Sequence, residues 1–233
     1  MNKIAPFIGK ELCEFYIIPQ LLSFANDTKN SVREALANNL INMCESLPQK
    51  TFMQKILPIY KILANDPNEK VRISIIKILP DFAKFCDSET NTNIILEIFL
   101  KFLKFSKNEK KENKNSKEIK FFLIKIFGPL ISLMEKKEIL KNEIIIKFYV
   151  EIIEKCYEEI KILEKYYYTS SNLFEIDEIL YICAYNFPAI LLKYENENWD
   201  LLKKSYFLLA ENSTKKIKNT IASSIGIVAN LLT

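Results

Sequence analysis

Two stretches of this chain repeat one another at a fixed distance. "NDTKNSVREALANNL" spans residues 26–40, and "NDPNEKVRISIIKIL" spans residues 65–79. The offset is 39 residues for five matched pairs: Pro19 and Pro58, Ala25 and Ala64, Asp27 and Asp66, Arg33 and Arg72, and Leu40 and Leu79. A constant offset over this length indicates a repeated structural unit.

A third and more divergent copy lies at "AENSTKKIKNTIASSI" from Ala210. There Ala25, Asp27, Val32, Arg33 and Leu40 correspond to Ala210, Asn212, Ile217, Lys218 and Ile225, each 185 residues further on. A period near 40 is typical of the two-helix solenoid repeats of the HEAT and armadillo kind. Three glycines and eight prolines also favour helices joined by short turns. We therefore predict an all-α fold, a HEAT-repeat α-solenoid (α-α superhelix) of about five helix pairs.

Apolar spacing predicts the helices of each pair. In the first clear pair they cover residues 13–26 and 32–44, and in the second pair Asp66-Pro67 ends the first helix. The later pairs are expected at residues 92–105 with 117–134, 142–163 with 175–194, and 198–212 with 215–233. The whole chain, residues 1–233, would then form a single solenoid, with a polar insertion at 106–118 and a short loop inside a pair near 165–175.

Local signals mark where helices start and bend. Ser31 followed by Glu34 has capping-box spacing, and Asn68 is placed to cap the second helix of its pair. Pro19, Pro58 and Pro129 predict bends in first helices, or turns just before them.

The shared aspartate and arginine predict a structural ladder. We expect Asp27 and Asp66 to accept hydrogen bonds in the turns, and Arg33 and Arg72 to bridge to an adjacent repeat. We thus interpret the motif as a structural element and not as an active site. The turns still line one edge of the superhelix, where partners of solenoids commonly dock.

The composition excludes most catalytic sites. The chain has no histidine, which removes the commonest general base and the commonest nitrogen metal ligand. Its three glycines are too far apart for a phosphate-binding loop, and its five cysteines lack a C-x-x-C pair, so we expect buried thiols in a reducing compartment. Adjacent carboxylates such as Asp177 and Glu178 point in different directions on a helix and make a poor catalytic dyad. We expect no enzyme activity, no metal and no cofactor.

Neither a signal peptide nor a membrane span is predicted. Residues 1–11 lack a long apolar run, and the most apolar window, "FFLIKIFGPLISLM", is interrupted by Lys125 and Pro129. We expect a cytoplasmic protein, with the nucleus as a further compartment, and no membrane partner. The segment Lys107–Lys120 holds six lysines and three glutamates, which is typical of a solvated loop, with contact to an anionic partner as the alternative.

Aromatic residues gather in "YYYTSSNLF" and "CAYNFPAILLKYENENW". On a helix, Tyr181, Tyr185 and Phe187 are expected in the core, with a partner-facing position as the alternative.

The order of the motifs resembles a known family. "IAPFIGKE", "YIIPQLLSFANDTKNSVREALANNLINMC", "ILPIYKILANDPNEKVRISIIKIL" and "FGPLISLM" follow one another as they do in the HEAT-repeat scaffold and regulatory subunits of type 2A-like serine/threonine phosphatases. "CAYNFPAILL", Asn198-Trp199 and "TIASSI" are most similar to protein phosphatase 4 regulatory subunit 1.

The resemblance implies a non-catalytic scaffold that binds the catalytic subunit of a type 2A-like, more narrowly type 4, phosphatase and biases its substrates or location. The second helices would supply the concave wall, and the turns would contact the partner. We expect ten turn residues to make that contact: Thr28, Lys29, Asn30, Asn68, Glu69, Lys70, Ser213, Thr214, Lys215 and Lys216.

Two alternatives come from other classes. One is an adaptor for the transport or assembly of other proteins, of the importin or condensin type. The other is a nucleic-acid-associated HEAT protein, although a pI of about 8.6 without a continuous basic stripe argues against nucleic acid as the partner. No sequence feature indicates an oligomeric state.

Overall fold

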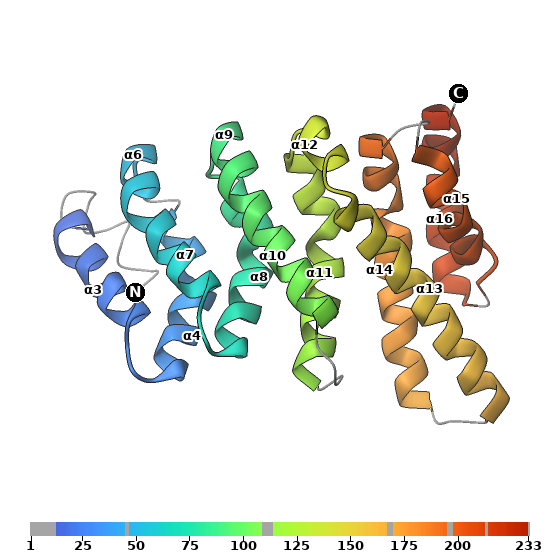
Figure 1. Cartoon of the computed structure of the whole chain (residues 1–233), viewed down its shortest axis with the longest axis horizontal. Coiled ribbons are helices and arrows are strands. Elements are labelled where there is room, and N and C mark those ends of the chain that lie inside the picture. Colours follow the sequence, from blue (N-terminus) through green and yellow to red (C-terminus); the bar gives the residue numbers. More distant parts are fainter. Residues whose placement is uncertain are drawn as a thin grey trace. The chain divides into compact units, whose positions relative to one another are not determined.

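The structure is a computed structural model that describes residues 13–44, 47–108, 114–166, 170–194, 198–212 and 214–232. Within these residues the chain consists of helices and short turns, and no strand is present (Figure 1). It divides into two compact units: unit 1 comprises residues 1–98 and 109–122, and unit 2 comprises residues 99–108 and 123–233. The predicted all-α class is confirmed.

Unit 1 is built from consecutive helix pairs. In the first pair a π-helical turn, η1 (Cys13–Ile17), continues into α3 (Ile18–Ala25), and the second helix is α4 (Asn30–Asn39) with the short α5 (Ile41–Cys44). The next pair consists of α6 (Gln49–Thr51), η2 (Phe52–Ile56) and α7 (Leu57–Ala64), packed against α8 (Glu69–Ala83). α9 (Ser88–Thr90) and η3 (Asn91–Ile95) open a third pair. The second helices α4 and α8 lie against each other, as stacked repeats require.

The period seen in the sequence extends to the backbone. The π-helical turns begin at Cys13, Phe52 and Asn91, which are 39 residues apart. Pro19 and Pro58 follow the first two turns and occupy the opening positions of α3 and α7, where a missing N–H costs little. These are the irregular first helices that the two prolines predict. The third copy keeps its π-helical turn with Glu97 in the proline position, so proline is not required for it.

Unit 2 contains the longer helices. They are the later part of α10 (Leu96–Asn108), the later part of α11 (Lys114–Leu133), α12 (Lys136–Leu140), α13 (Glu143–Tyr166), α14 (Ser170–Tyr194), α15 (Trp199–Ala210) and α16 (Lys215–Leu232). α13 packs against both α14 and α15, and α14 packs against α16. Two helix pairs, α13 with α14 and α15 with α16, therefore stack within this unit.

Three local predictions need correction. α10 extends to Asn108 and α11 begins at Lys114, so much of the predicted polar insertion is helical, because Lys and Glu are good helix formers even where no face is buried. Residues 109–113 lie outside the described chain. The loop near 165–175 is shorter than predicted, since α14 begins at Ser170. Pro129 lies inside α11, a second helix, and not at the start of a first helix.

Aromatic side chains dominate the core of both units. In unit 1 the rings of Tyr60 and Phe82 stack with their centroids 3.9 Å apart. In unit 2 the rings of Phe127 and Tyr149 stack at 5.5 Å. The largest fully buried side chains include Tyr60, Tyr149, Phe52, Phe82, Phe99, Phe102, Phe127 and Phe187. Each such ring contributes roughly 2–3 kcal/mol by leaving water.

Three second helices carry an internal proline, and each receives a side-chain hydrogen bond at the same relative place. The prolines are Pro80 in α8, Pro129 in α11 and Pro188 in α14. The accepting carbonyl lies five residues before the proline in every case: Tyr60 Oη donates to Ile75 O at 3.2 Å, Asn186 Nδ2 to Ile124 O at 2.9 Å, and Tyr149 Oη to Cys183 O at 2.7 Å. A proline ring opens the preceding helical turn, which lets a neighbouring helix reach a carbonyl that an unbroken helix would shield.

Gly128 allows α11 and α14 to approach closely in unit 2. A Cβ atom at this position would lie 2.4 Å from Oδ1 of Asn186, so only glycine fits. The same Asn186 side chain is buried and donates to Ile124 O. Two motifs that are far apart in the sequence, "FGPLISLM" and "CAYNFPAILL", thus meet at a single contact.

Candidate functional site

The repeated turn makes the same local hydrogen bond in each copy. Asp27 Oδ1 accepts the N–H of Lys29 at 2.8 Å, and Asp66 Oδ1 accepts the N–H of Asn68 at 2.8 Å. In the third copy Asn212 Oδ1 accepts the N–H of Thr214 at 2.7 Å. An amide oxygen can therefore replace the carboxylate, because this bond needs only a short side-chain acceptor. We call residues 27–33 and 66–72 the unit 1 turns, and residues 212–218 the unit 2 turn.

Arg33 ties the two unit 1 turns together. Its Nε lies 2.6 Å from Asp66 Oδ2 and its Nη2 lies 2.9 Å from Asp66 Oδ1, a two-pronged ion pair. Its Nη1 donates to the Asp27 carbonyl at 2.8 Å. The guanidinium group thus spans from its own turn to the next one, which is the bridge between adjacent repeats that the sequence predicts.

The bridge lies largely out of water and changes the acidity of its carboxyl group. The Asp66 side chain is 3% exposed and the Arg33 side chain 12%. Burial by itself would raise the pKa of Asp66, but the hydrogen bonds from Arg33 and Asn68, together with the charges of Arg33 and Arg72, outweigh it. The pKa of Asp66 therefore lies below its usual value, and the carboxylate stays ionised at neutral pH.

The ladder changes after the second repeat. Arg72 Nη1 donates to the carbonyls of Asp66 at 2.8 Å and Pro67 at 3.0 Å, so this arginine closes its own turn as Arg33 does. The residue 39 positions after Asp66 is Phe105. The sequence therefore offers no third carboxylate in register with Asp27 and Asp66.

The unit 2 turn is fixed to the preceding second helix by different chemistry. Thr214 Oγ1 lies 3.0 Å from both carboxylate oxygens of Asp177 in α14. Lys216 Nζ lies 3.1 Å from Glu178 Oε2 and 3.6 Å from the centre of the Tyr181 ring. The adjacent carboxylates Asp177 and Glu178, which make a poor catalytic dyad, instead receive a hydroxyl group and an ammonium group from the next repeat.

The residues predicted to contact a partner are mostly accessible. Thr28, Lys29, Asn30, Lys70, Lys215 and Lys216 are exposed, whereas Asn68, Glu69 and Thr214 are half-buried. Ser213 lies outside the described residues. Asn68 and Thr214 also hold the turn structure. The exposed lysines are therefore the main side chains that a partner could contact.

One predicted helix cap is present and the other is wrong. Asn68 Oδ1 accepts the N–H of Lys70 at 3.0 Å at the start of α8. α4 begins at Asn30 after Lys29, so Ser31 lies inside its first turn and does not cap it. The reason is the turn at Asp27. Its side chain accepts the Lys29 N–H and its carbonyl accepts the Arg33 guanidinium, so the helix already begins at Asn30.

The described residues hold no constellation for covalent or metal chemistry. Among them no group of three or more acidic or cysteine side chains could hold a metal ion, and none of their helices is long and apolar enough to cross a membrane. Burial raises the pKa of the Cys86 and Cys156 thiols to about 12. Cys183 is fully buried, and the side chains of Cys13 and Cys44 lie outside the described set. The described thiols are therefore unreactive packing groups.

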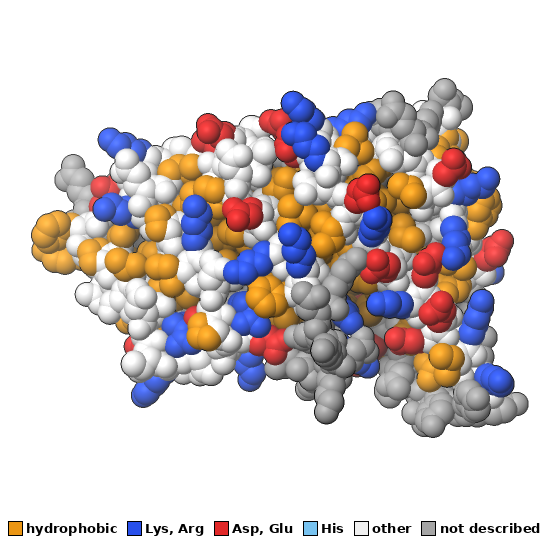
Figure 2. Space-filling view, viewed as in Figure 1, with side chains coloured by type: hydrophobic (Ala, Val, Ile, Leu, Met, Phe, Trp, Pro, Cys, Tyr) orange, Lys and Arg blue, Asp and Glu red, His pale blue; other side chains and the backbone are white. Residues whose placement is uncertain are grey.

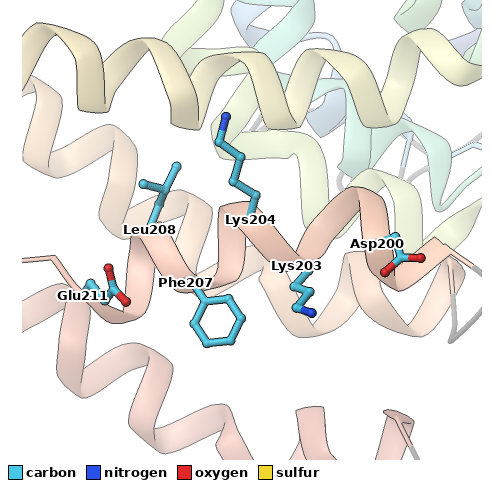
Figure 3. A pocket seen from close by; sticks show the side chains of 6 residues that line it. All are labelled: Asp200, Lys203, Lys204, Phe207, Leu208 and Glu211. Atoms are coloured by element: carbon cyan, nitrogen blue, oxygen red, sulfur yellow. The ribbon is translucent and has the colours of Figure 1, made fainter.

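A shallow surface hollow lies along α15 (Figure 3). Lys204 points toward α13, where its Nζ lies 2.6 Å from Glu154 Oε1, while Phe207 and Lys203 point to the other side of α15. The charged groups sit on the open surface of one helix and do not converge on an enclosed volume. The hollow is lined by Asp200, Lys203, Lys204, Phe207, Leu208 and Glu211, and its form fits surface contact better than catalysis.

Comparison with known proteins agrees with this architecture. A family model for the PPP2R1A-like HEAT repeat matches residues 10–74, the segment that contains both unit 1 turns. Residues 10–74 thus match a HEAT repeat. The chain is also 22% identical over 233 residues to the mouse (Mus musculus) protein named serine/threonine-protein phosphatase 4 regulatory subunit 4. This match covers all of the present chain and 22% of the relative, so the chain spans about a fifth of that protein's length.

The family match agrees with the predicted HEAT repeats. The relative is named as phosphatase 4 regulatory subunit 4, whereas the sequence resembles subunit 1, and the matches do not distinguish the two. Sequence reasoning missed the Thr214–Asp177 and Lys216–Glu178 contacts. The turn period identified Thr214 and Lys216 as turn residues, but nothing in the sequence pairs them with α14.

Proposed function

We propose that this chain is a non-catalytic scaffold or regulatory subunit that binds the catalytic subunit of a type 2A-like serine/threonine phosphatase, more narrowly one of type 4. The similarity to a phosphatase 4 regulatory subunit supports the choice of partner. The observation that carries the proposal is the repeated turn, which recurs with the same hydrogen bond and presents exposed polar side chains each time.

The turns suit this role because their backbone is held by hydrogen bonds while nearby side chains are exposed. Arg33 and Asp66 fix the backbone of the unit 1 turns, while Lys29 and Lys70 remain exposed beside them. In the unit 2 turn Thr214 fixes the backbone and Lys215 is exposed. Side chains on a fixed backbone lose less freedom on binding, so they favour affinity and specificity. Phosphatase chemistry would belong to the partner, and the chain itself would supply position and selectivity.

The first test is capture of the tagged chain from its own cell extract, followed by a phosphatase assay and mass spectrometry of the eluate. We expect an inhibitor-sensitive serine/threonine phosphatase to be recovered. Recovery of other proteins without phosphatase, from a folded sample, would contradict the proposal and favour an adaptor. Fractionation of the same cells would test the predicted cytoplasmic or nuclear location.

A charge-reversal variant tests the turns themselves. Lys29→Glu, Lys70→Glu and Lys215→Glu together change three exposed side chains of the turns. The matched control carries the same charge change at exposed positions on first helices, Lys55→Glu, Lys155→Glu and Lys161→Glu. We expect phosphatase capture to fall at least tenfold in the turn variant and to persist in the control. Equal capture by both variants would show that the partner binds elsewhere.

A further inference from the structure

A row of exposed side chains on α14 has no role in the stack of helix pairs. Tyr185 is 69% exposed and Leu192 is 54% exposed, although Phe187 between them is fully buried. Tyr181, Tyr185 and Leu192 are four and seven residues apart, so they share one face of the helix. The prediction that Tyr185 belongs to the core is therefore wrong, while Phe187 is in the core as expected.

The neighbouring helix α11 borders this row within unit 2. Asn186 donates to Ile124 O and lies against Gly128. The residues that follow these two in α11, Lys125 and Pro129, are exposed, and we infer that they lie on the same side as Tyr185, which precedes Asn186. At the other end Lys193 Nζ donates to Met134 O at 2.7 Å, and the residues just before these two, Leu192 and Leu133, are both exposed. We call Tyr185, Leu192, Pro129 and Leu133 the α14 patch.

Lysine is the only charged residue type within the segments that carry the α14 patch. In α11 from Leu123 to Leu133 the only charged residue is Lys125, and in α14 from Ile179 to Tyr194 it is Lys193. α16 carries Lys215, Lys216 and Lys218 and no acidic residue. The nearest carboxylate on the α14 face, Glu178, is already paired with Lys216. Lysines therefore outnumber carboxylates beside the apolar patch, where the exposed Glu135 lies two residues after Leu133.

The first helices of unit 2 differ. α13 and α15 carry acidic and basic residues in mixture, and on the face that Figure 2 shows, red and blue side chains alternate among the hydrophobic ones over these helices. A mixed surface is the ordinary state of a solvated helix. The lack of carboxylates is therefore a feature of these two segments of α11 and α14 and not of unit 2 as a whole.

We propose that the α14 patch docks an acidic segment of a protein partner that carries apolar side chains between its carboxylates. Tyr185 and Leu192 would receive the apolar side chains, and Lys125 and Lys193 would face the carboxylates. Exposed aliphatic groups contribute little to a phosphate backbone, and the three helices carry lysine without arginine, so a protein segment fits better than nucleic acid. None of the four patch residues is one of the ten turn residues proposed to contact the phosphatase, so variants of the patch and variants of the turns test the two proposals separately.

The test uses the full chain and a labelled synthetic peptide of alternating glutamate and leucine with one central phenylalanine, followed by fluorescence anisotropy. We expect this probe to bind, and to bind about tenfold more weakly when serine replaces its leucines and phenylalanine. Tyr185→Ser should weaken binding about tenfold, the usual size for a central aromatic contact. Lys125→Glu should weaken it several-fold and flatten its dependence on salt.

Matched controls lie on the first helices of the same unit. Phe207→Ser replaces an aromatic residue of comparable exposure, 47%, and Lys155→Glu reverses an exposed lysine; both should leave the affinity within twofold of the unaltered chain. All four positions are exposed, and unchanged circular dichroism would verify that the variants fold. Equal peptide binding by Tyr185→Ser, Lys125→Glu and the controls would overturn the proposal.

Two further probes separate other classes of ligand. An oligothymidylate and phosphatidylcholine vesicles with or without phosphatidylserine are measured against the same variants. If either probe binds, loses affinity in Tyr185→Ser and Lys125→Glu, and the acidic peptide does not bind, the patch is a nucleic-acid or lipid site and the proposal is wrong. Peptide binding that responds to the patch variants, with no such response of the other two probes, supports it.

Discussion

The turns of unit 1 and the turn of unit 2 both connect adjacent repeats, but the charges of the two partners are reversed. In unit 1 the second helix supplies the cation, Arg33, and the following turn supplies the carboxylate, Asp66. In unit 2 the second helix supplies the carboxylates, Asp177 and Glu178, and the following turn supplies a hydroxyl group and a cation. Each arrangement joins one repeat to the next at the start of a second helix.

The difference shows which part of the repeat is constrained. The local turn needs a side-chain acceptor two residues before its N–H donor, and Asp27, Asp66 and Asn212 all supply one. The contact across repeats needs only complementary partners, so its polarity can reverse. The unit 1 bridge is a largely buried ion pair, whereas the unit 2 contact combines a hydrogen bond from a hydroxyl group to a carboxylate with an exposed ion pair. The two should respond differently to mutation, acid and salt.

The largest effect is expected for Asp66→Ala. Removing this carboxylate leaves the largely buried Arg33 guanidinium without its two-pronged partner, which should cost about 3 kcal/mol in the free energy of unfolding. Urea denaturation measures it. Asp27→Ala removes the matching turn carboxylate but keeps the Arg33–Asp66 pair, and should cost about 1 kcal/mol. Hydrogen exchange should show lost protection in α4 and α8 and none in α14 and α16; equal loss in both units would contradict independent turns.

Acid should weaken the unit 1 bridge selectively. Because the folded-state pKa of Asp66 is lowered, its contribution is fully present above the unfolded pKa of about 3.9 and is lost as pH falls through the folded value. The difference in unfolding free energy between the unaltered chain and Asp66→Asn should thus be constant, at about 2 kcal/mol, above roughly pH 5. It should shrink at lower pH. A difference that does not change down to the acid limit would show that the ion pair is not its source.

Thr214→Val tests the hydroxyl–carboxylate contact of the unit 2 turn. The substitution keeps the shape of the side chain but removes the hydroxyl group that lies 3.0 Å from Asp177. We expect a loss of about 1 kcal/mol, measured by thermal unfolding. Thr214→Ser retains the hydroxyl group and should recover most of it. If Thr214→Ser lost stability and Thr214→Val did not, packing of the methyl group and not the hydrogen bond would be responsible.

The smallest effect is expected for Lys216→Gln. Its ion pair with Glu178 is exposed, with side-chain exposures of 55% and 35%, so the loss should be about 0.5 kcal/mol or less. Added salt should reduce the difference between Lys216→Gln and the unaltered chain, whereas it should leave the effect of Thr214→Val in place. A salt-insensitive loss would mean that contact with the Tyr181 ring, and not the ion pair, holds Lys216.

The sequence by itself determined the class of the fold, the positions of most helices and the first contact between repeats. The 39-residue offset was sufficient, because it marks equivalent residues without any knowledge of their surroundings. The cap at Asn68 also follows from local chemistry. The limits of the insertion and the supposed cap at Ser31 were predicted wrongly, since helix propensity of the lysine-rich segment and the Arg33 side chain override the local signals.

Only the tertiary structure decided which side chains of unit 2 meet and which face water. Thr214 contacts Asp177 across 37 residues, and Asn186 contacts Ile124 across 62; these pairs follow no repeat offset. The segment "ILYICAYNFPAILL" is apolar nearly all round its helix, so its pattern cannot indicate which residue is buried. Packing against α11, α13 and α16 makes that choice, and it leaves Tyr185 in water beside buried Asn186 because the helix has more apolar surface than its neighbours can cover.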